Sequence, residues 1–509
     1  MHTSSARRRL TCLVLLIAIG LAGTACQEHP IASEAPTRSA EPESASFVES
    51  SIPSADAARP TTTAPSPPTS TSTTLDPGSS TPGPAPRPPR PGGRPAPASP
   101  TTTTTTVAPA EIPPPVDAPG ADPATLALGA AHTCRLVSER IWCWGDNGSG
   151  QLGDRTTTSR AHPVLMPAEV PLPNASYLTL FDRAIDVTAG DAHTCAIGED
   201  RYVFCWGRND RGQTGGAMGT TLRPDLVRAP RGTAPDFVRD AIMIEAGAQH
   251  TCALIADGSV ACWGANEHGQ LGRGTRSGAN PGAREVPGLA RASQISAGGA
   301  TTCIVTDDRT VQCWGAGERG QIGDGRFEDR SVPTTLALTD VVRVAVAADH
   351  VCALLGSGRV NCWGNNDAGQ LGDGTTRSSA RPTEVTGLTG ATLISSGDGF
   401  SCAGSPDDRG TATAGWIDCW GRGDRFQTGD GTTANRTTPV PTFQEATNRI
   451  DVVNELRAGS SHACIAVNRT VLCWGGNSRG QVGDGTALDR PTPLAVSGLP
   501  GRGIVVSRQ

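Results

Sequence analysis

The stretch Cys252-Ala-Leu-Ile-Ala-Asp-Gly-Ser-Val-Ala-Cys262-Trp-Gly decides how this 509-residue chain folds, because variants of it recur seven times. Each copy has a first cysteine, eight to sixteen other residues, and a second cysteine that opens Cys-Trp-Gly. A period of that length indicates a repeat architecture, so most of the recurring motifs belong to a scaffold. The tryptophans recur every 49 to 62 residues, at Trp144, Trp206, Trp263, Trp314, Trp363, Trp420 and Trp474.

The quoted copy predicts a β-hairpin closed by a disulfide. Asp257-Gly258 lies between two apolar runs, which is a hairpin signal. A three-residue loop of residues 256–258, with Gly258 in the left-handed conformation, pairs Leu254 with Val260 and places Cys252 opposite Cys262. The two sulfur atoms then lie at a spacing that a disulfide can bridge.

The same logic applies to the other cysteine pairs, since fourteen cysteines after residue 26 fall into seven neighbouring pairs. Pairs with one residue fewer imply an even loop such as Asn468-Arg469, and the sixth pair encloses a longer excursion. Zinc is the alternative, but no Cys-x-x-Cys occurs and each pair belongs to a different repeat. Seven bridges require an oxidising compartment. The predicted disulfides are Cys134–Cys143, Cys195–Cys205, Cys252–Cys262, Cys303–Cys313, Cys352–Cys362, Cys402–Cys419 and Cys464–Cys473.

Each repeat has the composition of a small antiparallel sheet. A short strand such as 294–297 precedes the strand through the first cysteine, a tight turn, and the strand into Cys-Trp-Gly. A Gly-Gln-Leu-Gly segment such as 269–272 follows, and a loop with proline leads to the next repeat. Short strands separated by glycine at regular spacing predict an all-β repeat fold, and four-stranded units of this length favour a β-propeller.

The pattern Ala246-Gly-Ala-Gln-His-Thr-Cys252, Asp257-Gly258, Trp263-Gly-Ala-Asn266 and Gly269–Gly272 resembles the regulator-of-chromosome-condensation repeat. The resemblance covers residues 124–509 and implies a seven-bladed β-propeller. The cysteines depart from the family's eukaryotic founder and suggest an exported member. We expect the C-terminal strand Ile504-Val505-Val506 to complete the first blade and close the ring.

The N-terminus predicts export. Residues 1–26 combine Arg7-Arg8-Arg9, the apolar run Leu10–Leu21 and small residues that end at Cys26. Cys26 suggests a bacterial lipoprotein that is cleaved and acylated there, with release after cleavage or a retained anchor as alternatives. Residues 27–123, rich in Pro, Ser, Thr and Ala, predict a disordered stalk.

Charge and recurrence limit the possible sites. The net charge is −6 and every basic residue is arginine, scattered among acidic residues, which argues against nucleic-acid binding. Five histidines share one repeat position, where Thr301 and Phe400 replace them, so we expect a structural role for His132, His193, His250, His350 and His462. Gly-Asp-Gly-Thr turns lack the further ligands of a calcium loop and the helix of a phosphate site. We expect no catalytic, cofactor or metal site.

Residues that depart from the repeat are the better candidates for function. Segments 163–182 and 216–240 lengthen the first two connections between repeats, and segment 404–417 expands the sixth hairpin. These segments contain residue types that are enriched at the centres of protein interfaces. The alternative is that they are variable decoration. The candidate partner-binding residues are Met166, Tyr177, Phe181, Arg231, Phe237 and Trp416.

The sequence therefore predicts an extracytoplasmic, lipid-anchored, monomeric scaffold in the cell envelope that binds a protein or a glycan, with secretion as the alternative. Within the family a secreted bacterial propeller inhibits β-lactamases, but none of its contact residues can be transferred here. The resemblance also suggests guanine-nucleotide exchange on a small GTPase, against which export and the acidic charge argue. A third hypothesis is a polysaccharide-active enzyme with its site in the channel mouth.

Overall fold

The structure is a computed structural model. It describes residues 126–167, 169–171, 177–179, 183–229, 236–406, 415–442, 453–467 and 470–500. The predicted signal peptide, the predicted stalk and the segment Ile504-Val505-Val506 lie outside these residues. The described part of the chain consists of strands and turns, and none of it forms a helix that is long and apolar enough to cross a membrane.

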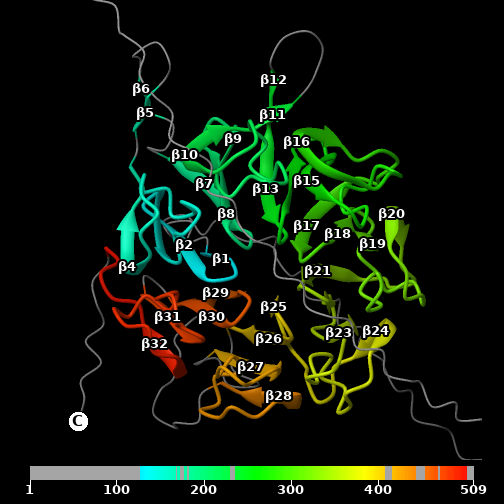
Figure 1. Ribbon diagram of the computed structural model, residues 1–509. Coiled ribbons are helices and arrows are strands. Elements are labelled where there is room, and N and C mark those ends of the chain that lie inside the picture. The colour runs from blue at the N-terminus through cyan, green and yellow to red at the C-terminus, as the bar shows by residue number, and fades with distance from the viewer. Residues whose placement is uncertain are drawn as a thin grey trace, which may run out of the picture. The chain divides into compact units, whose positions relative to one another are not determined.

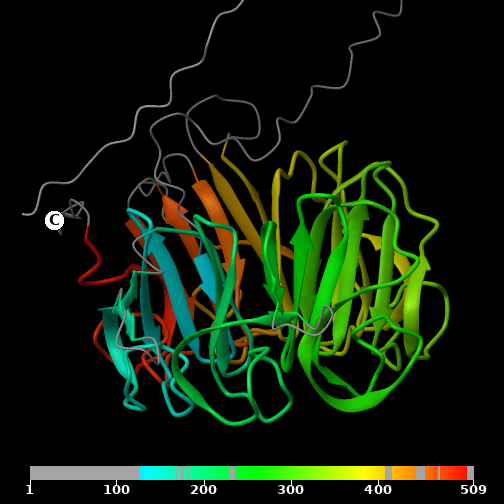
Figure 2. The same ribbon diagram turned by 90° about the horizontal axis from the view of Figure 1, so that it is seen from above.

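Seven four-stranded antiparallel sheets stand around a central axis, which confirms the seven-bladed β-propeller (Figure 1). Consecutive strands form each blade, and the first strand of each blade lies next to the axis. Viewed from above, the blades stand side by side around the ring (Figure 2). Numbered from the N-terminus, the blades are β1–β4, β7–β10, β13–β16, β17–β20, β21–β24, β25–β28 and β29–β32.

Strands at the same place in each blade have similar lengths. The innermost strands are β1 (Leu126–Leu128), β7 (Ala184–Ala189), β13 (Ala241–Ala246), β17 (Ala292–Gly298), β21 (Val341–Val346), β25 (Leu393–Gly397) and β29 (Val453–Ala458). The second strands are β2 (His132–Val137), β8 (His193–Gly198), β14 (His250–Ile255), β18 (Thr301–Thr306), β22 (His350–Leu355), β26 (Phe400–Ser405) and β30 (His462–Val467). The third strands are β3 (Arg140–Gly145), β9 (Val203–Gly207), β15 (Val260–Asn266), β19 (Val311–Gly315), β23 (Val360–Gly364), β27 (Trp416–Gly421) and β31 (Thr470–Gly475). The outer strands are β4 (Arg160–Leu165), β10 (Thr221–Leu226), β16 (Ser277–Glu285), β20 (Arg330–Thr335), β24 (Ser379–Glu384), β28 (Arg436–Pro441) and β32 (Arg490–Ala495).

The hairpin between the second and third strands has the predicted register. Cys252 pairs with Cys262 and Leu254 with Val260, and Gly258 has a φ of 86°. In the first blade Val137 pairs with Arg140 across a two-residue loop, as the even spacing requires. Every predicted cysteine pair is bonded, with a Cα–Cα distance of 4.1 Å in all seven.

The ring closes between the seventh blade and the first. β1 occupies the innermost position of the first blade, which corrects the expectation that Ile504–Val506 fill it. The amide of Leu126 donates to a carboxylate oxygen of Glu455 in β29 over 2.9 Å, so this hydrogen bond joins the first blade to the seventh. Because the N-terminal strand satisfies the inner edge of β2, blade 1 needs no strand from the C-terminus.

Candidate binding surfaces

One tryptophan in each blade anchors that blade to the preceding one. Its indole N–H donates to the backbone carbonyl of a glutamine in the preceding blade, over 2.9 Å at all seven interfaces. This glutamine follows a glycine in six blades and Phe426 in the sixth. All seven tryptophan side chains are fully buried. At the closing interface Trp144 donates to Gln481, so the ring closes with the same contact that joins the other blades.

The repeated histidine makes a second contact in the opposite direction. Nε2 of His132 lies 2.9 Å from the hydroxyl oxygen of Thr194 in the next blade, and that hydroxyl donates to the Gln151 carbonyl over 2.8 Å. The same arrangement joins His193 to Thr251, His250 to Thr302 and His462 to Thr133, and His350 meets the Ser401 hydroxyl. The histidines are therefore spread one per interface, as a structural role requires.

This arrangement fixes the tautomer of the histidine. The threonine has one hydroxyl proton, which it donates to the glutamine carbonyl, so His132 must donate from Nε2. Nδ1 of His132 is then an unprotonated, buried nitrogen without a hydrogen-bond partner. Burial lowers the pKa of His132 and His250 to about 4 and that of His193 and His462 to about 3. These four rings are neutral at physiological pH.

A group of charged side chains that the sequence did not reveal lies on the innermost strands, next to the central axis. Asp186, Glu245 and Glu455 come from three different innermost strands, and Arg343 and Arg457 from two. Burial raises the pKa of Asp186 to about 6 and of the two glutamates to about 7, and Arg457 opposes each shift. Burial thus brings the pKa values of these three carboxyl groups close to neutral pH.

Two of the three carboxylates are occupied by contacts between blades. Asp186 accepts the amide N–H of Ile244 in the next blade over 3.0 Å, and Glu455 accepts that of Leu126. Arg457 lies 3.2 Å from Glu455. Each bond satisfies an inner-strand amide that has no partner within its own sheet. Asp186 and Glu455 therefore join neighbouring blades, and the Glu455 bond also closes the ring.

The channel mouth is lined by small residues. Three residues from each blade surround a space of about 320 Å³, and glycine, alanine and serine supply most of them. Asp191 and Asp398 are the carboxylates there, and burial raises the pKa of both. Among the described residues no group of three or more His, Cys, Asp or Glu side chains could hold a metal ion.

The insertions after the first and second blades form short hairpins at the outer side of the ring (Figure 1). The first pairs β5 (Glu169–Pro171) with β6 (Tyr177–Thr179), and the second pairs β11 (Arg228–Ala229) with β12 (Asp236–Phe237). Val227 and Val238 are buried at the base of the second hairpin, where the amide of Val238 donates to the Val227 carbonyl and the amide of Val227 to the Val203 carbonyl. Its base is therefore fixed to the core of the propeller.

Met166 is a core residue, which corrects its assignment to a partner surface. Its side chain is 2% exposed, and its amide donates to the Ile141 carbonyl. Val227, Val286 and four further residues make the same backbone bond where their own outer strands end. Met166 thus occupies a repeat position, and the first insertion begins after it.

The other candidate residues do not come together in one site. Phe237 is half-buried in β12, opposite Arg228. Trp416 is half-buried and packs against the core between the fifth and sixth blades. Tyr177 lies in β6, opposite Pro171. Phe181 and Arg231 lie outside the described residues.

The fold and its contacts define a class: a seven-bladed β-propeller in which the tryptophan of each blade donates to a glutamine carbonyl of the preceding blade, with a disulfide in every blade. The sequence profile of the RCC1-like domain matches residues 99–441. The chain belongs to the RCC1-like domain family.

Proteins of different size and architecture are similar to this chain. The Ultraviolet-B receptor UVR8 of Arabidopsis thaliana is 28% identical over 396 residues, which cover 75% of this chain and 84% of UVR8. The E3 ubiquitin-protein ligase HERC2 of Homo sapiens is 29% identical over 372 residues, 70% of this chain but 7% of HERC2. Two solved structures share the fold. Human WBSCR16 has a TM-score of 0.58 and 23% identity, and the match covers 71% of this chain and 94% of WBSCR16. Prp20p of Saccharomyces cerevisiae has a TM-score of 0.58 and 20% identity, and the match covers 74% of this chain and 88% of Prp20p.

Proposed function

We propose that this protein is a binding scaffold outside the cytoplasm, held to the cell envelope by a lipid on Cys26, that presents the hairpins β5–β6 and β11–β12 to a protein partner. The observation that carries this proposal is the position of the two hairpins. They interrupt two successive connections of an otherwise regular ring, and the second is fixed to the core through Val227 and Val238. A rigid base lowers the ordering cost of binding.

Family membership supports a protein partner over a glycan. The solved structure of Prp20p is described together with its binding to Gsp1p and histones, and another shows yeast RCC1 bound to Kap60. Propellers of this fold therefore serve as protein-binding platforms. Guanine-nucleotide exchange rests on this likeness alone, and no feature of the described residues favours it here.

The side chains of the central channel are better suited to a non-catalytic role than to catalysis. A hydrolase needs carboxylates that are free to exchange protons with a substrate, whereas Asp186 and Glu455 accept backbone amides of the next blade. Small residues at the channel mouth leave little to orient a sugar chain. We therefore propose a monomeric, non-enzymatic scaffold.

The seven disulfides support export. Their formation requires an oxidising compartment, and each one lies within a blade where it closes a short hairpin. Metabolic labelling with palmitate, followed by fractionation, tests the anchor. The wild-type chain should carry label and sediment with membranes, whereas Cys26→Ala should do neither. Unlabelled wild-type protein in the soluble fraction would refute the lipid anchor.

Capture experiments test the surface. The full chain is prepared under oxidising conditions, immobilised, and exposed to envelope and secreted proteins of the source organism. Two variants are tested beside it. In one a Gly-Ser linker replaces residues 168–182, and in the other it replaces residues 229–236. Leu488→Ser is the matched control, because Leu488 is an exposed apolar residue of a repeat loop. A partner retained by the wild type and the control but lost from a hairpin variant supports the proposal. Equal capture by all four forms would exclude both hairpins.

A further inference from the structure

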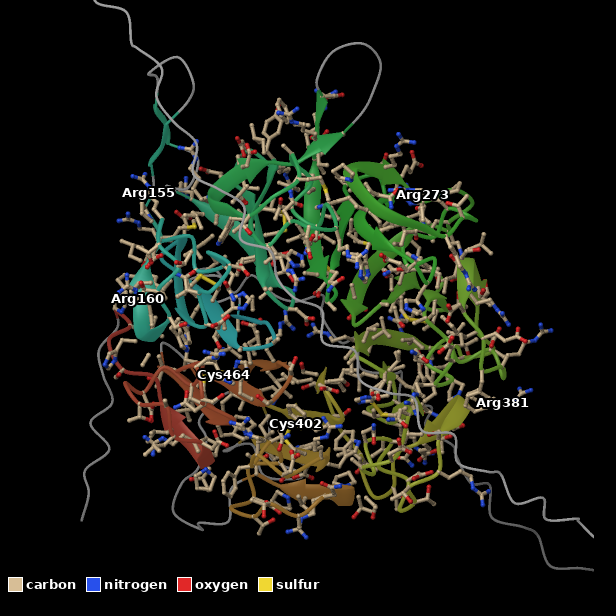
Figure 3. All side chains as sticks on the ribbon, in the orientation of Figure 1. Arg155, Arg160, Arg273, Arg381, Cys402 and Cys464 are labelled. Carbon is tan, nitrogen blue, oxygen red and sulfur yellow. A yellow bond between two sulfur atoms is a disulfide. The ribbon has the colours of Figure 1, made fainter. Side chains whose placement is uncertain are left out.

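An aspartate–arginine pair closes the outer turn of four blades. The aspartate belongs to the turn after Gly-Gln-x-Gly, or after Phe426-Gln-Thr-Gly in blade 6, and the arginine begins the outer strand six residues later. Arg160 lies 2.9 Å from Asp154, Arg330 lies 2.6 Å from Asp324, Arg436 lies 2.6 Å from Asp430, and Arg490 is bonded to Asp484. Figure 3 labels Arg160 at the outer rim of the ring, away from the labelled cysteines. The outer turns thus contain a repeated guanidinium site.

The geometry of that site is uniform. The guanidinium donates to Oδ2 of the aspartate, and in blades 6 and 7 a second nitrogen donates to the threonine two residues after the aspartate. The four aspartate side chains are between 1% and 12% exposed, so the arginine covers them. Charge-assisted, two-point binding of this kind selects arginine over lysine.

Blade 5 keeps the receiving groups and lacks the arginine. Thr375 donates to Asp373 from its amide over 2.9 Å and from its hydroxyl over 2.8 Å, as Thr486 does to Asp484 in blade 7. The residue six positions after Asp373 is Ser379, which pairs with Gly364 just as Arg490 pairs with Gly475. Serine therefore stands at the place of the missing arginine.

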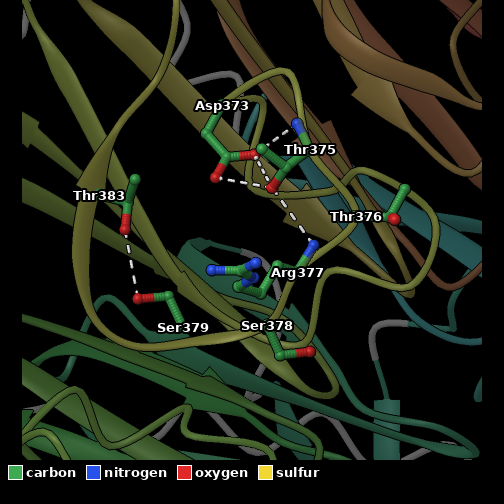
Figure 4. Close-up of a pocket in the computed structure, with 7 residues that line it drawn as sticks. All are labelled: Asp373, Thr375, Thr376, Arg377, Ser378, Ser379 and Thr383. Carbon is green, nitrogen blue, oxygen red and sulfur yellow. Dashed lines mark hydrogen bonds between the residues drawn. The ribbon is translucent and has the colours of Figure 1, made fainter.

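An open pocket of about 620 Å³ lies at this place (Figure 4). Asp373, Thr375, Ser379 and Thr383 line it, together with Thr376, Arg377 and Ser378. The Ser379 hydroxyl donates to the Arg381 carbonyl and accepts from Thr383, so it does not reach Asp373. Oδ2 of Asp373 bonds only the Thr375 hydroxyl among the described residues, and in blades 1, 4, 6 and 7 this oxygen holds the arginine.

The surroundings add an apolar neighbour and a competing cation. Phe327 of blade 4 is 52% exposed. A β-carbon on Gly320 would lie 3.0 Å from Cε1 of Phe327 and 3.1 Å from the β-carbon of Ala380, the residue after Ser379. The Phe327 ring is therefore close to the backbone that carries Ser379. The aliphatic stem of an incoming side chain could cover that ring. Arg377 is exposed and lines the pocket without an ion pair to Asp373.

We propose that the blade 5 pocket binds the guanidinium group of an arginine that a protein partner inserts. Asp373 Oδ2 accepts two of its N–H groups and the Thr375 hydroxyl accepts a third, in the manner of Arg436 and Arg490. The site is on the outer rim of blade 5 and does not depend on the two hairpins. It adds a sequence requirement for the partner: an exposed arginine.

Methyl NMR of the full chain tests the pocket directly, because Thr375, Thr376 and Thr383 place three methyl groups in its wall. The probe is N-acetyl-arginine amide, and N-acetyl-lysine amide and sodium chloride are its controls. We expect saturable shifts of these three methyl signals with a dissociation constant of about 1–10 mM, because the bound guanidinium group makes several charge-assisted hydrogen bonds rather than one exposed ion pair. Lysine amide should bind at least about threefold more weakly.

Three variants make the result decisive. Ser379→Arg supplies the guanidinium from the chain itself and should abolish the shifts, while Arg377→Ala removes the competitor and should strengthen binding. Arg490→Ser opens the equivalent site of blade 7, so the Thr486 methyl signal should begin to respond to the probe. Absence of saturable shifts in the wild type and in Arg377→Ala would overturn the proposal. So would equal shifts with sodium chloride, or shifts that persist in Ser379→Arg.

Discussion

Five of the seven blade interfaces contain the histidine–hydroxyl pair, and two do not. Between blades 4 and 5 the histidine is replaced by Thr301 and its partner by Val351. Between blades 6 and 7 the replacements are Phe400 and Ala463. At both interfaces the two members change together, although they stand about fifty or more residues apart in the chain. The tryptophan bond to the glutamine carbonyl of the preceding blade stays at 2.9 Å in both.

The difference shows that the pair is one unit of packing with two versions, one that contains the histidine–hydroxyl bond and one that lacks both of its members. A β-carbon on Gly397 would lie 2.3 Å from Cε1 of Phe400, and one on Gly190 would lie 2.2 Å from Cε1 of His193, so both rings pack on the glycine in the same way. A ring nitrogen buried without a partner is costly, and a hydroxyl is equally costly. The chain therefore keeps both members of the histidine–hydroxyl pair or replaces both, and the Thr301 hydroxyl donates instead to the Ala316 carbonyl.

Acid should break the polar interfaces first, and this is the largest effect that we expect. The pKa values of His132, His193, His250 and His462 lie at about 3 to 4 in the folded protein, below the 6.5 of an exposed histidine. The unfolded chain therefore binds protons first as the pH falls from about 6.5 to about 4, and stability is lost across that window. The loss should be on the order of 3 kcal/mol per histidine, measured by urea unfolding.

The channel carboxylates act in the opposite sense, so the test compares variants. The pKa values of Asp186, Glu245 and Glu455 are raised to about 6 to 7, and their contribution therefore grows as the pH falls toward 4. The double variant His193→Phe, Thr251→Ala copies the interface of blades 6 and 7 and should lose less stability in acid than the wild type. His162→Gln, which changes an exposed histidine, should follow the wild type. A double variant as acid-sensitive as the wild type would contradict the assignment.

Phe400→His places a polar ring in an apolar interface. Ala463 cannot accept from its Nε2, so the variant should lose about 2–4 kcal/mol through an unpaired, buried nitrogen and the lost aromatic packing. Adding Ala463→Thr should restore at least about 1 kcal/mol, since the new hydroxyl can accept from the ring and donate to the Gln427 carbonyl, as Thr194 does at Gln151. Equal unfolding free energies for the single and double variants would refute the pairing.

The parts of this structure that the sequence predicts are those with local causes. Asp257-Gly258 and the cysteine spacing determine a hairpin register, because the turn and the bridge act within eleven residues. His132 and Thr194 contact each other across neighbouring blades but stand 62 residues apart in the sequence, and no local pattern indicates which hydroxyl faces which ring. Asp186, Glu245 and Glu455 converge from separate strands for the same reason.

Two features were within reach of the sequence. The backbone bond that Met166 shares with Val227 and Val286 is made by an apolar residue after the outer strand in six of the seven blades, with Thr442 in blade 6. This pattern would have placed the start of the insertion after Met166. The aspartate followed by arginine six residues later appears in four repeats, and its interruption at Ser379 is visible in the printed sequence. Comparing repeats position by position, rather than by motif, reveals both.

Thr194→Val removes one half of a polar pair and should cost about 1–3 kcal/mol. His132 keeps the N–H on Nε2 that donated to the hydroxyl, and this group becomes a buried donor without an acceptor. The matched second step is His132→Phe in the Thr194→Val background, which removes the orphaned donor. A double-mutant cycle of unfolding free energies should give a coupling of about 1 kcal/mol or more. Additive effects would show that the pair is not a unit.

Val351→Thr makes the reverse change in the interface of blades 4 and 5, and we expect the smallest effect there. Among the described residues the Gln321 carbonyl accepts only the indole N–H of Trp363, so its second lone pair is open to a new hydroxyl. No histidine stands at residue 301, and the substitution therefore orphans no donor. The unfolding free energy should change by less than about 1 kcal/mol, because the new bond offsets the burial of the hydroxyl. A loss as large as that of Thr194→Val would mean that the hydroxyl position itself is unfavourable, and that the histidine, rather than the glutamine carbonyl, makes it acceptable elsewhere in the ring.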